Sequence, residues 1–186
     1  MNLKILVCLA WMGLICGSLN VAGQTYETNP DYLRTKNWTI GNDILVEFKD
    51  TIKLGNSKVN TSEAYASFSS KSGKLLYYSD AVNLYDSNST IISSLKGDKS
   101  SVQGVLISGN DTIINIVTTT DIGREDGAYY YTFKNGVKIQ DRKLLSPVCE
   151  MQGMVKHSNR HHEWIVLHKF RSDSIYVFLT KENNIY

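Results

Sequence analysis

Four polar side chains near the start of strand-like segments could line a ligand channel or supply acid–base chemistry. They are Glu63 in "SEAYAS", Gln103 in "VQGVL", and Glu150 and Gln152 in "CEMQGM". A glycosidase needs two carboxyl groups about 5–10 Å apart. Glu63 and Glu150 could supply this pair only if the chain closed into a ring. We therefore predict that the four residues line a channel and catalyse nothing.

The four histidines, His157, His161, His162 and His168, lie within twelve residues and suggest a metal site. However, His162 and His168 are six residues apart in one strand-like segment, or about 20 Å at roughly 3.3 Å per residue. One ion cannot contact both at normal ligand distances. The stretch "HEWIVLH" also lacks the second histidine of H-E-x-x-H, because position 166 is Val166. We expect turn or structural histidines and no metal.

Other reactive residues point to no recognisable chemistry. Asp121, Glu125 and Asp126 cluster in the glycine-flanked loop "DIGREDG", but their spacing does not match a calcium-binding EF-hand loop. The sequence contains no phosphate-binding glycine loop and no G-x-S-x-G nucleophile elbow. We predict that the protein is not an enzyme and uses no cofactor.

The N-terminus has the features of a secretory signal peptide. Lys4 precedes the apolar run 5–16, and small residues follow up to Gly23. The run is too short for a transmembrane helix, which needs about 20 residues. We predict a signal peptide over 1–23, which makes the protein secreted or displayed at the cell surface. Cleavage would leave Cys149 as the single cysteine, so no intrachain disulfide is expected.

Composition and local pattern predict an all-β protein. The chain has two prolines and eleven tyrosines, and short runs rich in Val, Ile, Tyr, Phe and Thr alternate with Gly, Asn, Asp and Ser. The polar segment 24–36 is expected to be extended or poorly ordered. A net charge of +2 without long blocks of like charge does not favour nucleic acid or membranes as partners. The predicted strands lie at 44–48, 62–70, 74–80, 82–86, 102–109, 111–120, 128–134, 151–157, 163–170 and 174–181.

Three of these strand pairs repeat one pattern, in which a polar turn precedes a strongly apolar strand. Tyr78, Val117 and Leu167 occupy comparable places, 39 and 50 residues apart. A unit of about 40–50 residues with several short strands is typical of a β-propeller blade. The runs "LLYY", "IINIV" and "WIVL" lack polar alternation, which predicts that both faces of these strands are covered. A β-sandwich of seven to nine strands is the alternative.

Three motifs along the chain together form a familiar pattern. They are the W-x-x-G opening (Trp38, Gly41), the hairpin "TSE…AS…GKLLYYSD" within residues 61–80 and "MVKH…WIVLH" (His157, Trp164, His168). By these motifs, residues 37–186 resemble the N-terminal region of large secreted WD-type β-propeller proteins of Bacteroidetes, which often end in a gliding-motility-associated or type IX secretion sorting domain. The resemblance implies a secreted or surface protein without assigned catalytic residues.

The same resemblance implies that the ring of blades is incomplete. We expect residues 37–186 to form about three blades of a truncated propeller, with the missing blades supplied by a longer or a second chain, because three blades leave an apolar face and a strand edge open. The expected function is non-enzymatic presentation of loops for protein or glycan binding. The alternatives are a scaffold domain of a larger surface protein and a fragment of a polysaccharide-active propeller enzyme.

Overall fold

The computed structural model describes residues 31–122, 125–181 and 184–186. The predicted signal peptide over 1–23 lies outside the described residues, as do residues 24–30 of the predicted extended segment. In the part of the chain that is described, no helix is long and apolar enough to cross a bilayer.

Over the described residues the chain forms four antiparallel sheets, named A to D here, and one short 3-10 helix, η2 (Tyr32–Thr35). Sheet A contains β1 (Asn37–Ile40), β2 (Ile44–Phe48) and β3 (Ile52–Asn56). Sheet B contains β4 (Ala66–Ser69), β5 (Leu75–Ser79), β6 (Asn83–Asp86) and β7 (Ile91–Ser94). Sheet C contains β8 (Val105–Gly109), β9 (Ile113–Thr119), β10 (Ala128–Lys134) and β11 (Val137–Leu145). Sheet D contains β12 (Val148–Lys156), β13 (Glu163–Lys169), β14 (Ile175–Lys181) and β15 (Asn184–Ile185).

This architecture confirms the all-β prediction, and each of the ten predicted segments contains a strand. The four separate sheets differ from the two layers of the alternative β-sandwich. The structure corrects the prediction for the end of segment 24–36, since residues 32–35 form η2 and are not extended. Long-range side-chain contacts of Arg34 hold this turn in place.

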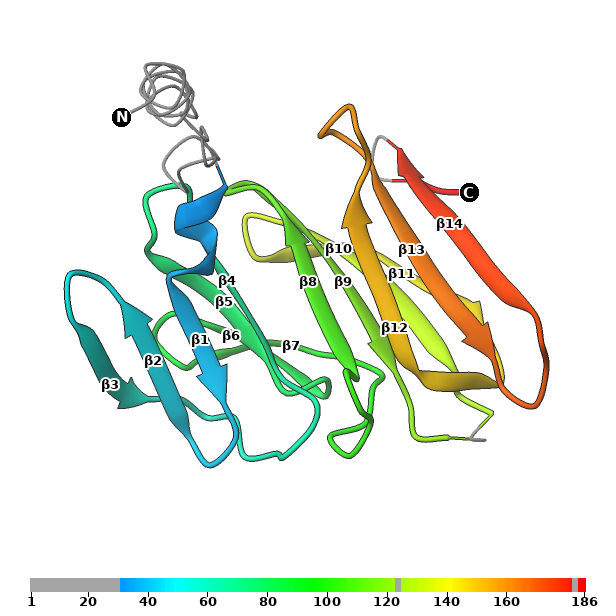
Figure 1. Ribbon diagram of the computed structural model, residues 1–186, viewed down its shortest axis with the longest axis horizontal. Coiled ribbons are helices and arrows are strands. Elements are labelled where there is room, and N and C mark those ends of the chain that lie inside the picture. The colour runs from blue at the N-terminus through cyan, green and yellow to red at the C-terminus, as the bar shows by residue number, and fades with distance from the viewer. Residues whose placement is uncertain (1–30, 123–124, 182–183) are drawn as a thin grey trace, which may run out of the picture. The chain divides into compact units, whose positions relative to one another are not determined.

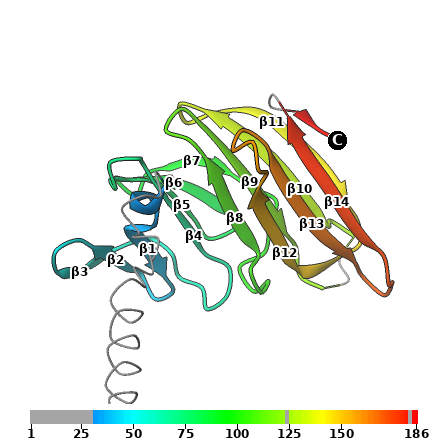
Figure 2. The same ribbon diagram turned by 45° about the horizontal axis from the view of Figure 1, so that its top comes forward.

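In every sheet the strands follow one another in chain order, so each sheet is a simple meander. The apolar clusters of the core lie between consecutive sheets, which places the sheets face to face in the order A, B, C, D, as Figures 1 and 2 show. The first strands of these sheets are also neighbours, because β4 contacts both β1 and β8, and β8 contacts β12.

Strand β10 shows why continuous apolar runs form the middle of this stack. Tyr129, Tyr131 and Phe133 pack into the cluster shared with sheet B. Ala128 and Tyr130 pack into the cluster shared with sheet D. Successive side chains point to opposite faces of a strand, so a strand between two packed sheets must be apolar on both faces. The run "IINIV" predicted that both faces of its strand are covered. Strand β9 confirms this, because its side chains also pack into both clusters.

The prediction for "WIVL" is only half right. Ile165 and Leu167 of β13 are buried against sheet C. Trp164 and Val166 point to the other face and are half-buried, and no further sheet among the described residues covers them. Sheet D therefore leaves an apolar face open, whereas the "LLYY" strand β5 contributes to the clusters on both sides of sheet B.

Candidate functional site

Glu150, a predicted channel residue, caps two loops of the neighbouring sheet. From β12 its Oε2 accepts a hydrogen bond from the backbone N–H of Val102 at 3.0 Å. Its Oε1 accepts from the backbone N–H of Ile122 at 3.4 Å. Because both of its oxygens accept from backbone N–H groups, the geometry of Glu150 suits loop anchoring better than proton transfer.

Gln152, two residues further along β12, also bonds to the backbone of sheet C and of the turn before it. Its side chain is 7% exposed, and its Nε2 donates to the backbone oxygens of Gln103 at 2.8 Å and Val117 at 3.4 Å. The Oε1 atom of Gln152 is buried and has no partner in the described structure. Gln103 contributes only its backbone to this contact, since its own side chain is exposed in a turn with a φ of 53°.

The structure thus brings together three of the four predicted residues at the junction of sheets C and D, where Gln152 bonds to Gln103 and Glu150 bonds to Val102. Glu63 is exposed in the loop before β4. No hydrogen bond or ion pair among the described residues connects it to Glu150. The carboxylate pair considered from the sequence is therefore not assembled by any contact seen here.

The histidines bond locally around the hairpin turns of sheet D. His157 Nδ1 accepts from the backbone N–H of Asn159 at 3.1 Å, and Asn159 Nδ2 lies 2.9 Å from His162 Nδ1. His168 Nε2 donates to the backbone oxygen of Ser172 at 2.6 Å. Across the described ranges, no group of three His, Cys, Asp or Glu side chains is arranged to hold a metal ion.

A groove of about 450 Å³ lies along the first strands of sheets A, B and C. Its lining is mainly apolar and includes Trp38 and Ile40 of β1, Tyr65 before β4, and Leu106 and Ile107 of β8. Trp38 is 52% exposed and Tyr65 is 38% exposed. Exposed aromatic rings beside aliphatic side chains form a surface that can bury an apolar part of a ligand.

The ring of Trp38 is fixed before any ligand arrives. Its Nε1 donates to the backbone oxygen of Thr35 at 2.8 Å, and its ring meets Phe48 edge-on at a centroid distance of 5.2 Å. In the next position, Thr39 has a buried Oγ1 without a hydrogen-bond partner in the described structure, and Thr39 also lines the groove. Since Thr39 Oγ1 is buried, a ligand cannot reach this polar atom, whereas the fixed aromatic ring of Trp38 is exposed to it.

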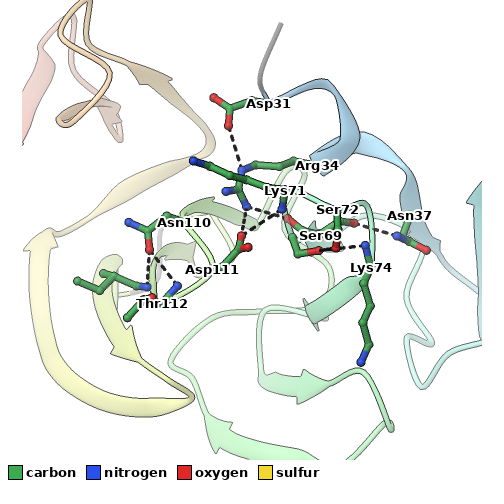
Figure 3. Close-up of polar contacts among 12 residues, drawn as sticks. Asp31, Arg34, Asn37, Ser69, Lys71, Ser72, Lys74, Asn110, Asp111 and Thr112 are labelled. Atoms are coloured by element: carbon green, nitrogen blue, oxygen red, sulfur yellow. Dashed lines mark hydrogen bonds and ion pairs between the residues drawn. The ribbon is translucent and has the colours of Figure 1, made fainter. Parts of the chain in front are cut away.

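One end of the groove is built on Arg34, which Figure 3 shows between Asp31 and Asp111. The Arg34 side chain is 7% exposed, and its Nε donates to Asp31 Oδ1 at 3.0 Å. Its Nη1 donates to Asp111 Oδ1 at 2.8 Å and to the backbone oxygen of Ser69 at 3.0 Å. The guanidinium also lies over the ring of Phe68. Because its charge is paired within the protein, Arg34 positions the groove and offers little to a ligand.

Sequence reasoning missed this cluster and the groove. Arg34 and Asp111 are 77 positions apart, and neither residue belongs to a recognisable motif. Two signals were present in the sequence: the W-x-x-G opening, which contributes Trp38, and the turn residues Gly109 and Asn110. In the structure, Asn110 accepts hydrogen bonds from the backbone N–H groups of Thr112 and Ile113 in that turn.

No family model, curated protein or solved structure matches this chain. The resemblance to Bacteroidetes propeller proteins therefore stays a prediction from the sequence.

Proposed function

We propose that the chain is a secreted or cell-surface β-propeller module that binds a protein or glycan ligand and catalyses no reaction. The observation that carries this proposal is the groove along β1, β4 and β8 with its exposed Trp38 and Tyr65. Its volume of about 450 Å³ falls within the roughly 300–1,000 Å³ of ligand pockets.

The propeller assignment is supported by repetition of one unit. Sheets B, C and D are each four-stranded meanders, and consecutive sheets share an apolar cluster. In a propeller the first strand of every blade lies nearest the central channel. The side-by-side placement of β1, β4, β8 and β12 agrees with that arrangement.

The absence of catalysis is supported by the way the candidate carboxylates are used. Glu150 accepts hydrogen bonds from two backbone N–H groups. The carboxylate of the exposed Glu63 makes no hydrogen bond or ion pair within the described residues. The mainly apolar lining of the groove favours a protein ligand with an apolar anchor over a fully polar glycan.

The test is binding by the purified chain to a glycan array and to a library of purified extracellular protein fragments. We expect Trp38→Ala to weaken binding of any ligand found by about tenfold or more. Trp164→Ala, on the open face of sheet D, is the matched control and should bind as the wild type does. Equal binding by Trp38→Ala would contradict the groove. Polysaccharide hydrolysis that is lost in Glu63→Gln or Glu150→Gln would instead favour an enzyme.

The second candidate function is a scaffold domain of a larger surface protein. It is favoured by the open apolar faces of the two end sheets, where Leu54 of sheet A is 76% exposed and Val177 of sheet D is 56% exposed. Soluble monomers rarely expose large apolar patches. This function would be supported over ligand binding if no glycan or protein fragment bound the chain and if copies of the chain associated through these faces.

A further inference from the structure

A second cavity between sheets C and D contains a buried carboxylate that the protein itself does not fully satisfy. Glu163, the first residue of β13, is 4% exposed. Its Oε2 accepts one hydrogen bond, from Asn115 Nδ2 at 3.1 Å. In the part of the chain that is described, the side chain of Glu163 makes no other hydrogen bond and no ion pair.

The donor to Glu163 is held in a fixed orientation. Asn115 Oδ1 accepts from the Tyr130 hydroxyl at 2.9 Å and from Thr132 Oγ1 at 3.2 Å, so its amide nitrogen must face Glu163. Burial raises the pKa of Tyr130 to about 12, which keeps the phenol protonated as a donor. The network thus gives Glu163 one donor, on Oε2, and leaves Oε1 able to accept from a ligand.

Glu163 lines a cavity of about 210 Å³ with a mainly polar lining. This volume is below the roughly 300–1,000 Å³ typical of drug-sized ligands, so the cavity suits a single small molecule. Asn115, Tyr130 and Glu163 line it together with Arg160 and Lys181. The lining therefore includes an anionic side chain, Glu163, and cationic side chains, Arg160 and Lys181.

One of the cationic side chains, Arg160, is also available to a ligand. Arg160 is exposed in the β12–β13 turn, and its guanidinium makes no hydrogen bond or ion pair within the described ranges. A third lining cation, Lys156, is 3.8 Å from Asp31 and so already has a weak ion pair. His161 completes the charged and titratable side chains of the cavity.

We propose that this cavity binds a small zwitterion of the α-amino acid class, with its ammonium group on Glu163 and its carboxylate on Arg160. An ammonium offers three donors and no acceptor, which is what the unsatisfied carboxylate needs. Arginine matches a carboxylate with two parallel hydrogen bonds. A neutral sugar would leave the buried charge of Glu163 without a counter-charge. This site is separate from the groove and does not depend on the function proposed for it.

The first test is calorimetric titration of the purified chain with the standard L-amino acids. Propylamine, propionate and N-acetylglycinamide serve as probes that carry one charge or none. We expect at least one amino acid to bind with 1:1 stoichiometry and about tenfold or more tighter than each probe. The proposal is overturned if no amino acid binds at millimolar concentration. It is also overturned if propionate binds as tightly as the amino acids, because that shows an anion site alone.

Variants then assign the two ends of the ligand. Glu163→Gln keeps an oxygen for Asn115 and removes the charge, and Arg160→Gln removes the cation. Each should weaken amino acid binding by about 10- to 100-fold. Arg171→Gln is the matched control, since Arg171 is likewise exposed in a hairpin turn of sheet D with positive φ. If circular dichroism shows that Glu163→Gln does not fold, the amino acid affinities of Arg160→Gln and Arg171→Gln still test the proposal. Wild-type affinity in Arg160→Gln would overturn the assignment.

Discussion

At the scale of single residues, the buried Asp80 shows how a carboxylate can stabilise this fold. Its Oδ1 accepts from the backbone N–H groups of Val82 at 3.1 Å and Asn83 at 2.7 Å. Its Oδ2 lies 2.7 Å from Lys99 Nζ. Burial alone raises the pKa of Asp80, but the hydrogen bond and charge of Lys99, with the two backbone N–H groups, outweigh it and leave the pKa lowered.

A lowered pKa in the folded state has a definite consequence for stability. The contribution of Asp80 is present above its unfolded pKa of about 3.9 and is lost as pH falls through its lower folded pKa. We expect Asp80→Asn to reduce the free energy of unfolding by about 1–3 kcal/mol at neutral pH. Below about pH 4 the difference from wild type should shrink.

Urea denaturation at several pH values measures this effect. Asp173→Asn is the control, because Asp173 is exposed and has no hydrogen bond or ion pair in the described structure. A difference between Asp80→Asn and wild type that stays constant from pH 7 to about pH 3 would contradict the role of the ionised carboxylate.

At the scale of elements, the sequence predicted the strands that are buried and missed several that are not. Strand β10 is buried at six of its seven positions, so its apolar and aromatic run is unmistakable. Strand β11 lies at the edge of sheet C, carries Lys138, Asp141 and Arg142, and is mostly exposed. Edge strands often carry charges that prevent further pairing, which gives them the composition of a loop.

The position of η2 could not be predicted either, because it depends on contacts distant in sequence. Arg34 bonds Ser69 at the end of β4 and Asp111 in the β8–β9 turn, which ties η2 to sheets B and C. Asp111 also accepts from the backbone N–H of Lys71 at 3.2 Å. The polar composition of residues 24–36 contains no sign of these partners.

We expect Arg34→Ala to destabilise the fold by about 2 kcal/mol, since it removes several charge-assisted hydrogen bonds and a packed side chain. Arg171→Ala, at an exposed turn, should change stability by less than about 0.5 kcal/mol. Chemical denaturation measures both variants. Hydrogen exchange should also show faster exchange at the Lys71 amide in Arg34→Ala. Equal stability of the two variants would show that the cluster contributes nothing.

At the scale of the whole molecule, three of the four predicted site residues lie at the junction of sheets C and D, where they hold loops and strands together. Glu150 and Gln152 were recognised because they recur at the start of a repeated unit, and that position does place them against sheet C. Glu163 was overlooked because its importance arises from Asn115, which is 48 positions away on another sheet. Repetition in a sequence reveals the units, whereas the contacts between units form the sites.

The open faces of sheets A and D lead to a prediction about association. Ile52 and Leu54 are exposed on sheet A, and Ile175 and Val177 are exposed on sheet D. Each face has the apolar character of the surfaces that pack between neighbouring sheets within the chain. We expect the wild-type chain to associate as its concentration rises, because contact between such faces removes apolar area from water at about 25 cal/mol per Å².

Sedimentation velocity over a range of concentrations measures this association. Leu54→Lys or Val177→Lys should weaken it by about tenfold or more, because each puts a charge into the contact. Lys53→Leu adds apolar area on the opposite face of β3 and, if the outer face of sheet A is the surface that associates, should leave its association unchanged. A wild-type chain that stays monomeric at every concentration would mean that the end sheets tolerate exposure to water. In that case the argument for a scaffold within a larger assembly would lose its support, and the groove would remain as the basis for function.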